Sequence, residues 1–204
     1  ATFRRLAGVG AVTVGLAAMM AAPASAVPLW PDAGLGAWGA GALGQMGDGN
    51  TNTTNSVPQV TDASGVLSGK VVTSVSVGNN FACAVASGAA FCWGQRSAGK
   101  LGDGGATTGQ TNTPVAVSTS GVMSGKTITT VSAGGGSACA LDTAGSAYCW
   151  GAGSQGQLGN GGSSNVGSPV AVTMPAGKVF TSIAVGFTHA CASTSDGLAY
   201  CWGS

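Results

Sequence analysis

Three times along this chain, two cysteines lie nine or ten residues apart, and Trp-Gly directly follows the second cysteine. The copies span residues 83–94, 139–151 and 191–203, and Trp38-Gly39 is a cysteine-free version of the same step. The tryptophans Trp38, Trp93, Trp150 and Trp202 are separated by 55, 57 and 52 residues. A period of this size is typical of a repeat protein in which each repeat forms one supersecondary unit. This pattern therefore predicts a repeat architecture.

The six cysteines all belong to these copies, and the even count favours disulfides formed in an oxidising compartment. A metal site is the alternative, but the chain has one histidine and no Cys-x-x-Cys pair. Each cysteine pair brackets a short turn that places the two cysteines opposite each other in an antiparallel hairpin, within disulfide distance. We therefore predict no metal and three bridges: Cys83–Cys92, Cys139–Cys149 and Cys191–Cys201.

Each repeat contains four short apolar stretches separated by turn residues, and the pattern after residue 26 predicts strands and no amphipathic helix. The cysteine hairpin supplies two strands, and a strand with alternating apolar residues precedes it. A shorter strand that starts at proline supplies the fourth. Proline suits this position because the first residue of a strand needs no N–H for pairing. The expected strands outside the hairpins are 57–60, 114–117 and 169–172, and 71–77, 127–133 and 179–185.

The motif residues of the last repeat carry a family resemblance. Gly156-Gln157-Leu158-Gly159, Pro169-Val170, His189-Ala190-Cys191 and Tyr200-Cys201-Trp202-Gly203 resemble the regulator-of-chromosome-condensation repeat, and the resemblance covers about residues 37–204. It implies an all-β protein, a β-propeller with one four-stranded blade per repeat. Cysteine-paired repeats of this kind resemble secreted bacterial members of the family.

The number of repeats is smaller than the resemblance leads us to expect. Propellers close with about four to eight blades and this family usually with seven, whereas the repeats here divide approximately into 38–93, 94–150 and 151–204. We expect the sequence to be a piece of a seven-bladed ring that is truncated at its C-terminus, with missing blades or further domains in the same polypeptide. Self-association into a closed ring is the alternative.

Residues 1–26 have the pattern of a secretory signal peptide. Arg4 and Arg5 precede an uncharged apolar run over 6–22, and Ala24-Ser25-Ala26 supplies the small residues that a signal peptidase needs. An uncleaved membrane anchor is the alternative, because the apolar run is almost long enough to span a bilayer. We predict that the signal peptide 1–26 is cleaved and that residues 27–37 form an N-terminal lead-in. The mature protein is then expected to be secreted or at the cell surface, without a membrane segment.

Several strings imitate ligand-binding motifs without the structural context that those motifs need. Gly39–Gly44 and Gly151–Gly156 match G-x-G-x-x-G, but no β-α-β unit surrounds them. Gly94–Lys100 imitates a phosphate-binding loop that lacks its Ser or Thr, and 48–52 lacks the spacing of a calcium loop. His189 has no second histidine and no glutamate to act with. We therefore predict no catalytic residue, no cofactor and no metal ligand.

Charge and loop composition indicate what kind of partner the protein has. Without residues 1–26, five basic side chains face six aspartates, a net charge of −1, which opposes nucleic-acid binding. We expect the four tryptophans, each followed by a glycine (Gly39, Gly94, Gly151 and Gly203), to pack between blades. The stretches 50–56, 105–113 and 162–168 differ most between repeats, so they are the expected contact loops for an extracellular protein partner.

These features favour a secreted, non-enzymatic binding module for protein partners. Two other functions stay open. One is guanine-nucleotide exchange on a small GTPase, which the nuclear member of the family implies, and the other is a structural module of a longer cell-surface protein.

Overall fold

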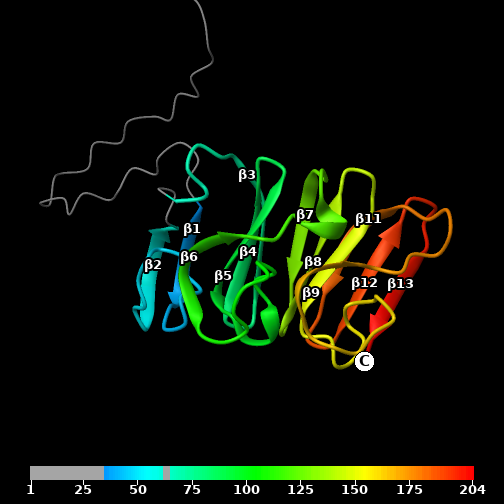
Figure 1. The fold of residues 1–204 in the computed structure, drawn as a ribbon. Helices are drawn as coiled ribbons and strands as arrows, with labels where there is room; N and C mark the ends of the chain where they lie inside the picture. The colour runs from blue at the N-terminus through cyan, green and yellow to red at the C-terminus, as the bar shows by residue number, and fades with distance from the viewer. Residues whose placement is uncertain (1–34, 62–64) are drawn as a thin grey trace, which may run out of the picture.

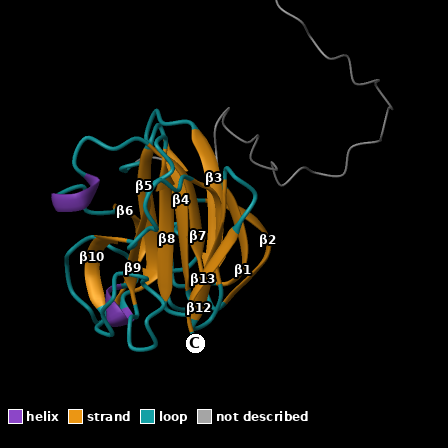
Figure 2. Cartoon of the chain, turned by 90° about the vertical axis from the view of Figure 1, so that its right-hand side faces the viewer, coloured by secondary structure: helices purple, strands orange, loops and turns teal. Residues whose placement is uncertain are grey.

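A computed structural model describes residues 35–61 and 65–204 of the chain. The expected signal peptide and most of the expected lead-in over 27–37 lie outside the described residues. Within them, thirteen strands form four antiparallel sheets that stand side by side in chain order (Figure 1). Seen along this row, the axes of the strands in all four sheets are roughly aligned, with loops at both ends (Figure 2).

The sheets differ in their number of strands. The second and third have four strands each, the first has two and the fourth has three. Their strands are β1 (Gly36–Ala40) and β2 (Thr54–Val60); β3 (Val72–Gly78), β4 (Phe81–Ala86), β5 (Ala89–Gln95) and β6 (Gln110–Ala116); β7 (Ile128–Ala133), β8 (Ser137–Asp142), β9 (Ala147–Gly151) and β10 (Val166–Ala171); and β11 (Phe180–Val185), β12 (His189–Thr194) and β13 (Ala199–Gly203). Two single-turn 3-10 helices, Ser97–Gly99 and Gly121–Met123, lie in the connections. The predicted all-β fold with four-stranded blades is confirmed.

The sequence repeats and the sheets do not begin and end at the same residues. The second sheet has the order β3-β4-β5-β6, so its outer strand β6 comes from the sequence repeat that follows Trp93. The third sheet takes its outer strand β10 from the next repeat in the same way. The repeat boundaries placed at 93/94 and 150/151 therefore lie inside β5 and β9. Because the second and third sheets each contain residues of two repeats, their outer strands β6 and β10 connect neighbouring repeats.

The expected position of the prolines at the first residue of a strand is wrong. Pro114 lies in the interior of β6 and Pro169 in the interior of β10. The pairing of both strands shifts register beside the proline, between Cys92 and Gly94 and between Val166 and Val170. Both are edge strands, where a bulge accommodates a residue that has no N–H.

The hairpins follow the predicted register. Cys83 lies opposite Cys92, Cys139 opposite Cys149 and Cys191 opposite Cys201, and the structure joins each pair by a disulfide. The first hairpin turns through Ser87 and Gly88, both at positive φ (49° and 78°), as a two-residue type I′ loop requires. The longer loops end in Gly145 and Gly197, at φ 74° and 83°. The extra residue of the two longer hairpins therefore lies in the turn, and their cysteines remain opposite each other.

Apolar side chains fill the spaces between the second and third sheets and between the third and fourth sheets. Between the second and third sheets, Phe81, Cys83 and Val85 pack in one cluster with Val131 and Trp150. The third and fourth sheets enclose a second cluster in the same manner. Face-to-face burial of this kind is the main source of stability in stacked sheets.

Candidate functional site

Three of the repeated tryptophans connect each sheet to a loop of the preceding sheet. The indole Nε1–H groups of Trp93, Trp150 and Trp202 donate to the carbonyl oxygens of Gln45, Lys100 and Gln157, each at 3.0 Å. The glycine two residues after each acceptor packs on the indole ring: a Cβ added to Gly47, Gly102 or Gly159 would lie 2.7 Å from it. The repeated tryptophan and glycine therefore fix the path of one loop per repeat.

These loops end in three exposed segments, 48–53, 103–109 and 160–165, which we call the outer loop belt. Each segment begins with the same side-chain turn. Oδ1 of Asp48 accepts the N–H of Asn50 (3.0 Å), Oδ1 of Asp103 that of Gly105 (3.1 Å), and Oδ1 of Asn160 that of Gly162 (3.0 Å). A side chain that bonds the backbone two residues on is a usual way to stabilise a turn.

Backbone hydrogen bonds make the belt continuous from sheet to sheet. The N–H of Gly49 donates to the carbonyl of Asn112 (2.9 Å), and the N–H of Gly104 donates to that of Gly167 (2.8 Å). Both acceptors lie in the outer strands β6 and β10 of the following sheets. Neighbouring loops and outer strands therefore form one surface.

The predicted contact stretches fall only partly in loops. Residues 50–53, 105–109 and 162–165 lie outside the strands, whereas 54–56, 110–113 and 166–168 belong to β2, β6 and β10. The belt carries exposed threonine, serine, asparagine and glycine residues. Asp103, the first residue of the second belt loop, pairs with Arg96, and both side chains are 17% exposed. The surface therefore offers many uncharged donors and acceptors.

Lys100, in the middle of one of these loops, is unavailable to a ligand. The residue is 2% exposed, and its Nζ donates to the carbonyl of Asn79 (2.9 Å) and to Oε1 of Gln95 (2.8 Å). Nζ also lies 5.3 Å from the centre of the Phe81 ring. Burial lowers the pKa of Lys100 because it disfavours the charged form. Its contacts give it a structural role in the loop.

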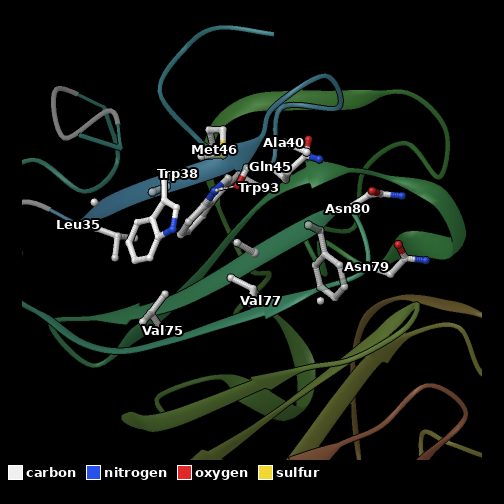
Figure 3. Close-up of a pocket in the computed structure, with 15 residues that line it drawn as sticks. Leu35, Trp38, Ala40, Gln45, Met46, Val75, Val77, Asn79, Asn80 and Trp93 are labelled. Atoms are coloured by element: carbon white, nitrogen blue, oxygen red, sulfur yellow. Dashed lines mark hydrogen bonds between the residues drawn. The ribbon is translucent and has the colours of Figure 1, made fainter. Parts of the chain in front are cut away.

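An apolar hollow of about 570 Å³ lies between β1 and β3 (Figure 3). Trp38, Val75 and Val77 line it, with Asn79 and Asn80 at one end. Trp38 is 67% exposed, so it differs from the buried Trp93 and Trp150. No residue of this lining has an acidic, basic or nucleophilic side chain. The hollow therefore offers apolar contact without acid–base chemistry.

The sequence comparison decides the family. A profile described as "Regulator of chromosome condensation (RCC1) repeat" matches residues 36–85 and 144–193, and a second profile of that description matches 128–157. The chain belongs to the RCC1 repeat family. The resemblance inferred from the motif residues is thereby confirmed.

Relatives with RCC1 repeats are much longer than this chain. Human HERC2, an E3 ubiquitin-protein ligase, is 33% identical over 169 residues, which are 81% of this chain and 3% of HERC2. The ultraviolet-B receptor UVR8 of Arabidopsis thaliana is 28% identical over 168 residues, which are 81% of this chain and 36% of UVR8. The chain thus spans little more than a third of these relatives at most, and their activities do not transfer to it.

Solved structures agree with the fold. Human WBSCR16 superposes with a TM-score of 0.72 at 26% identity, over 83% of this chain and 43% of WBSCR16. Prp20p from Saccharomyces cerevisiae superposes with a TM-score of 0.69 at 21% identity, over 82% of this chain and 40% of Prp20p. The second likeness shows the fold alone. Together they place the four sheets as blades of an RCC1 β-propeller.

The lone histidine lies at a repeated RCC1 position that holds Phe81 and Ser137 in the other blades. His189 is exposed at the start of β12, beside a shallow hollow lined by Cys191, Cys201 and Trp202. Across residues 35–61 and 65–204, no three His, Cys, Asp or Glu side chains gather as metal ligands would. In the same part of the chain, no helix is long and apolar enough to cross a membrane.

Proposed function

We propose that this chain is a secreted, non-enzymatic RCC1-repeat module that binds a protein partner through the outer loop belt. The observation that carries the proposal is the continuity of the belt. Backbone hydrogen bonds hold the first two loops against the outer strands β6 and β10 of the following sheets, so the belt offers a prearranged surface of hydroxyl, amide and backbone groups. Surfaces rich in Ser, Asn and Gly supply adaptable hydrogen bonds in other protein-binding loops, and prearrangement lowers the entropy cost of binding.

The absence of enzymatic activity is supported by the side chains that are present. Lys100 is buried, and His189 has no acid or base near it among the residues that line its hollow. The belt's two carboxylates, Asp48 and Asp103, each accept a backbone N–H of their own turn, and Asp103 is also paired with Arg96. Catalysis needs an acid, base or nucleophile that is free to act; the belt's carboxylates are engaged in their turns, and the lining of the hollow at Trp38 has no acidic, basic or nucleophilic side chain.

Export is supported by two independent features. The signal-peptide pattern over 1–26 precedes a chain whose three hairpins are closed by disulfides. Such bridges persist in oxidising compartments and are rare in the cytosol and nucleus. The same bridges oppose the exchange-factor alternative, since a nuclear regulator would work among reduced thiols. N-terminal sequencing of the exported chain tests this part: we expect it to begin at Val27, and an unprocessed N-terminus contradicts export by this route.

Charge insertion on the belt tests the binding surface. Asn52, Thr108 and Ser164 are exposed belt residues, one in each loop. A triple variant that replaces them by lysine places three cations on the surface without changing a buried contact. Ser124→Lys, an equally exposed change in the connection between the second and third sheets, is the matched control.

We expect the triple variant to lose the protein that the wild-type chain captures from extracellular fluid, and the Ser124→Lys variant to keep it. Equal capture by all three proteins would place the binding surface elsewhere. Loss of capture in the control would show that added charge acts nonspecifically.

A further inference from the structure

The second loop of the belt, together with the segment that leads into it, differs from the other two at three repeated positions. It has arginine where they have glycine, alanine where they have leucine or glutamine, and lysine where they have glutamine. The positions are 96 against 41 and 153, 98 against 43 and 155, and 100 against 45 and 157. Residues 94–109 contain one arginine, one lysine and one aspartate, whereas 39–53 contain one aspartate and 151–165 no charged residue. The second loop is therefore the positively charged one of the three.

The lysine removes a hydrogen bond that the other two loops make. Oε1 of Gln45 accepts the N–H of Leu43 at 2.8 Å. Oε1 of Gln157 accepts the N–H of Gln155 at 2.7 Å. A lysine side chain has no acceptor, and Ala98 adopts φ 60° and ψ 9°, in the left-handed region that residues other than glycine seldom occupy. The second loop has thus lost a stabilising bond and contains a strained residue.

The same loop admits a side chain that the other two loops exclude. A Cβ added to Gly41 or Gly153 would lie 2.4 or 2.0 Å from a backbone oxygen of its own loop. The second belt loop is one residue longer, 103–109 against 48–53 and 160–165. In this longer loop the backbone N–H of Arg96 donates to the carbonyl of Gly109 at 2.8 Å. The departures of the second loop therefore have one common result, an arginine side chain beside the belt.

Asp103 and Gly105 hold the guanidinium of this arginine against the belt. Nη1 of Arg96 donates to Oδ2 of Asp103, whose Oδ1 accepts the N–H of Gly105 at 3.1 Å. A Cβ added to Gly105 would lie 3.2 Å from Nη1, so the glycine leaves space for the guanidinium. A guanidinium has five N–H donors, and the bond to Asp103 is the one that this side chain makes within residues 35–61 and 65–204. The group is therefore oriented and partly exposed, with donors that Asp103 does not use.

We propose that Arg96 is a specificity-determining residue of the belt and binds a carboxylate of the protein partner. This inference rests on the proposed function, since it names the group that the belt recognises. The planar fork of a guanidinium matches the two oxygens of a carboxylate. Its pairing with Asp103 orders the side chain before the partner arrives, which lowers the entropy cost of binding. Asp103 offsets one positive charge of the loop, and Lys100 supplies a second one with no carboxylate among its contacts.

Arrays of matched peptides test the proposal. Each pair has one random sequence with either glutamate or glutamine at its centre, and both members end in an amide. We expect the wild-type chain to bind the glutamate members about tenfold more tightly, the factor that a charge-assisted hydrogen bond is worth. A third member, with glutamine and a free C-terminal carboxylate, distinguishes a side-chain carboxylate from a chain terminus as the group that is bound.

Three variants separate the guanidinium from charge in general. Arg96→Gln should abolish the preference for glutamate and keep the binding of the glutamine members. Arg96→Lys keeps the charge without the fork, so the preference should be smaller than in the wild type. Lys126→Gln is the matched control, because it removes an exposed cation that is also paired with an aspartate, Asp142 at 3.8 Å. This control should keep the full preference.

Equal binding of glutamate and glutamine members by the wild-type chain would overturn the proposal, as would a preference that Arg96→Gln retains. Binding of the glutamine members reports on the belt itself, and the triple variant with lysine at positions 52, 108 and 164 should lose it. If the triple variant loses this binding while Arg96→Gln keeps the glutamate preference, the belt binds proteins but Arg96 does not select them. If the triple variant binds the glutamine members as the wild type does, the proposed function itself is contradicted.

Discussion

Replacement of Trp150 by alanine would empty the space that the most completely buried of the repeated tryptophans fills. Trp150 is 0% exposed in the cluster between the second and third sheets, and its indole N–H donates to the carbonyl of Lys100. Truncation of a buried tryptophan to alanine costs about 3–5 kcal/mol. We expect Trp150→Ala to lower the free energy of unfolding by this amount, a large part of the stability of a domain of this size.

Two further variants test the reasoning: one removes only the hydrogen bond of Trp150, and the other removes an exposed tryptophan. Trp150→Phe keeps most of the ring but leaves the Lys100 carbonyl without its donor, which should cost about 1–3 kcal/mol. Trp38→Ala removes a side chain that is 67% exposed, so it should change the free energy of unfolding by no more than about 0.5 kcal/mol.

Urea unfolding followed by tryptophan fluorescence and circular dichroism measures all three variants, with coincident transitions as the test of two-state behaviour. The predicted order of destabilisation is Trp150→Ala, then Trp150→Phe, then Trp38→Ala. Equal destabilisation by Trp38→Ala and Trp150→Ala would refute the assignment of Trp150 to the packed interface and of Trp38 to an open surface.

Three other predictions follow from burial, charge and backbone geometry. The Cys191–Cys201 bridge has an exposed cysteine, whereas the cysteines of the other two bridges are 0% exposed. A mild reductant should therefore open this bridge first and release its thiols for alkylation, and simultaneous alkylation of all six cysteines would contradict this. Hydrogen bonding from Lys178 lowers the pKa of Asp196 to about 2 from 3.8, so the pair should stabilise the fold above pH 3.8 and lose this effect as the pH falls through 2. An NMR titration of Lys178→Ala should show the pKa of Asp196 rising towards its ordinary value, and an unchanged pKa would exclude Lys178 as its cause. Gly102→Ala should destabilise more than Gly109→Ala in thermal unfolding, since both have positive φ but only Gly102 packs on Trp150; equal losses would assign the cost to φ alone.

Much of the fold follows from the spacing of a few residue types. The one-residue difference between hairpins, together with the position of glycine in each turn, predicts that the cysteines lie directly opposite one another, and the structure agrees. These are local relations, since the turn and its two strands lie within about a dozen residues. Local hydrogen bonding and side-chain alternation are therefore sufficient to predict them.

The relation between repeats was not predictable in the same way. The sequence shows where the proline-containing strand lies within its repeat. It does not show that this strand, β6, completes the sheet of the preceding repeat. Pro114 also lies inside its strand, because an edge strand tolerates a missing N–H where the register shifts. Both facts depend on pairing between residues far apart in the chain.

The candidate site shows the same limit. The variable stretches of the sequence mark the loops, yet the continuity of the belt rests on backbone bonds such as Gly49 to Asn112. Backbone atoms carry no sequence signal, so these bonds could not be inferred from residue types. The buried position of Lys100 was also missed, and its one available signal was a lysine that replaces the glutamine found at positions 45 and 157.

Photo-crosslinking tests the proposed binding surface most directly. A photoreactive residue at position 108, in the middle loop of the belt, would capture any protein that contacts this surface, and the same probe at position 124 serves as the control. The account predicts a protein adduct from extracellular fluid at position 108 that is absent at position 124. No adduct at position 108, or the same adduct at both positions, would contradict the assignment of protein binding to the outer loop belt.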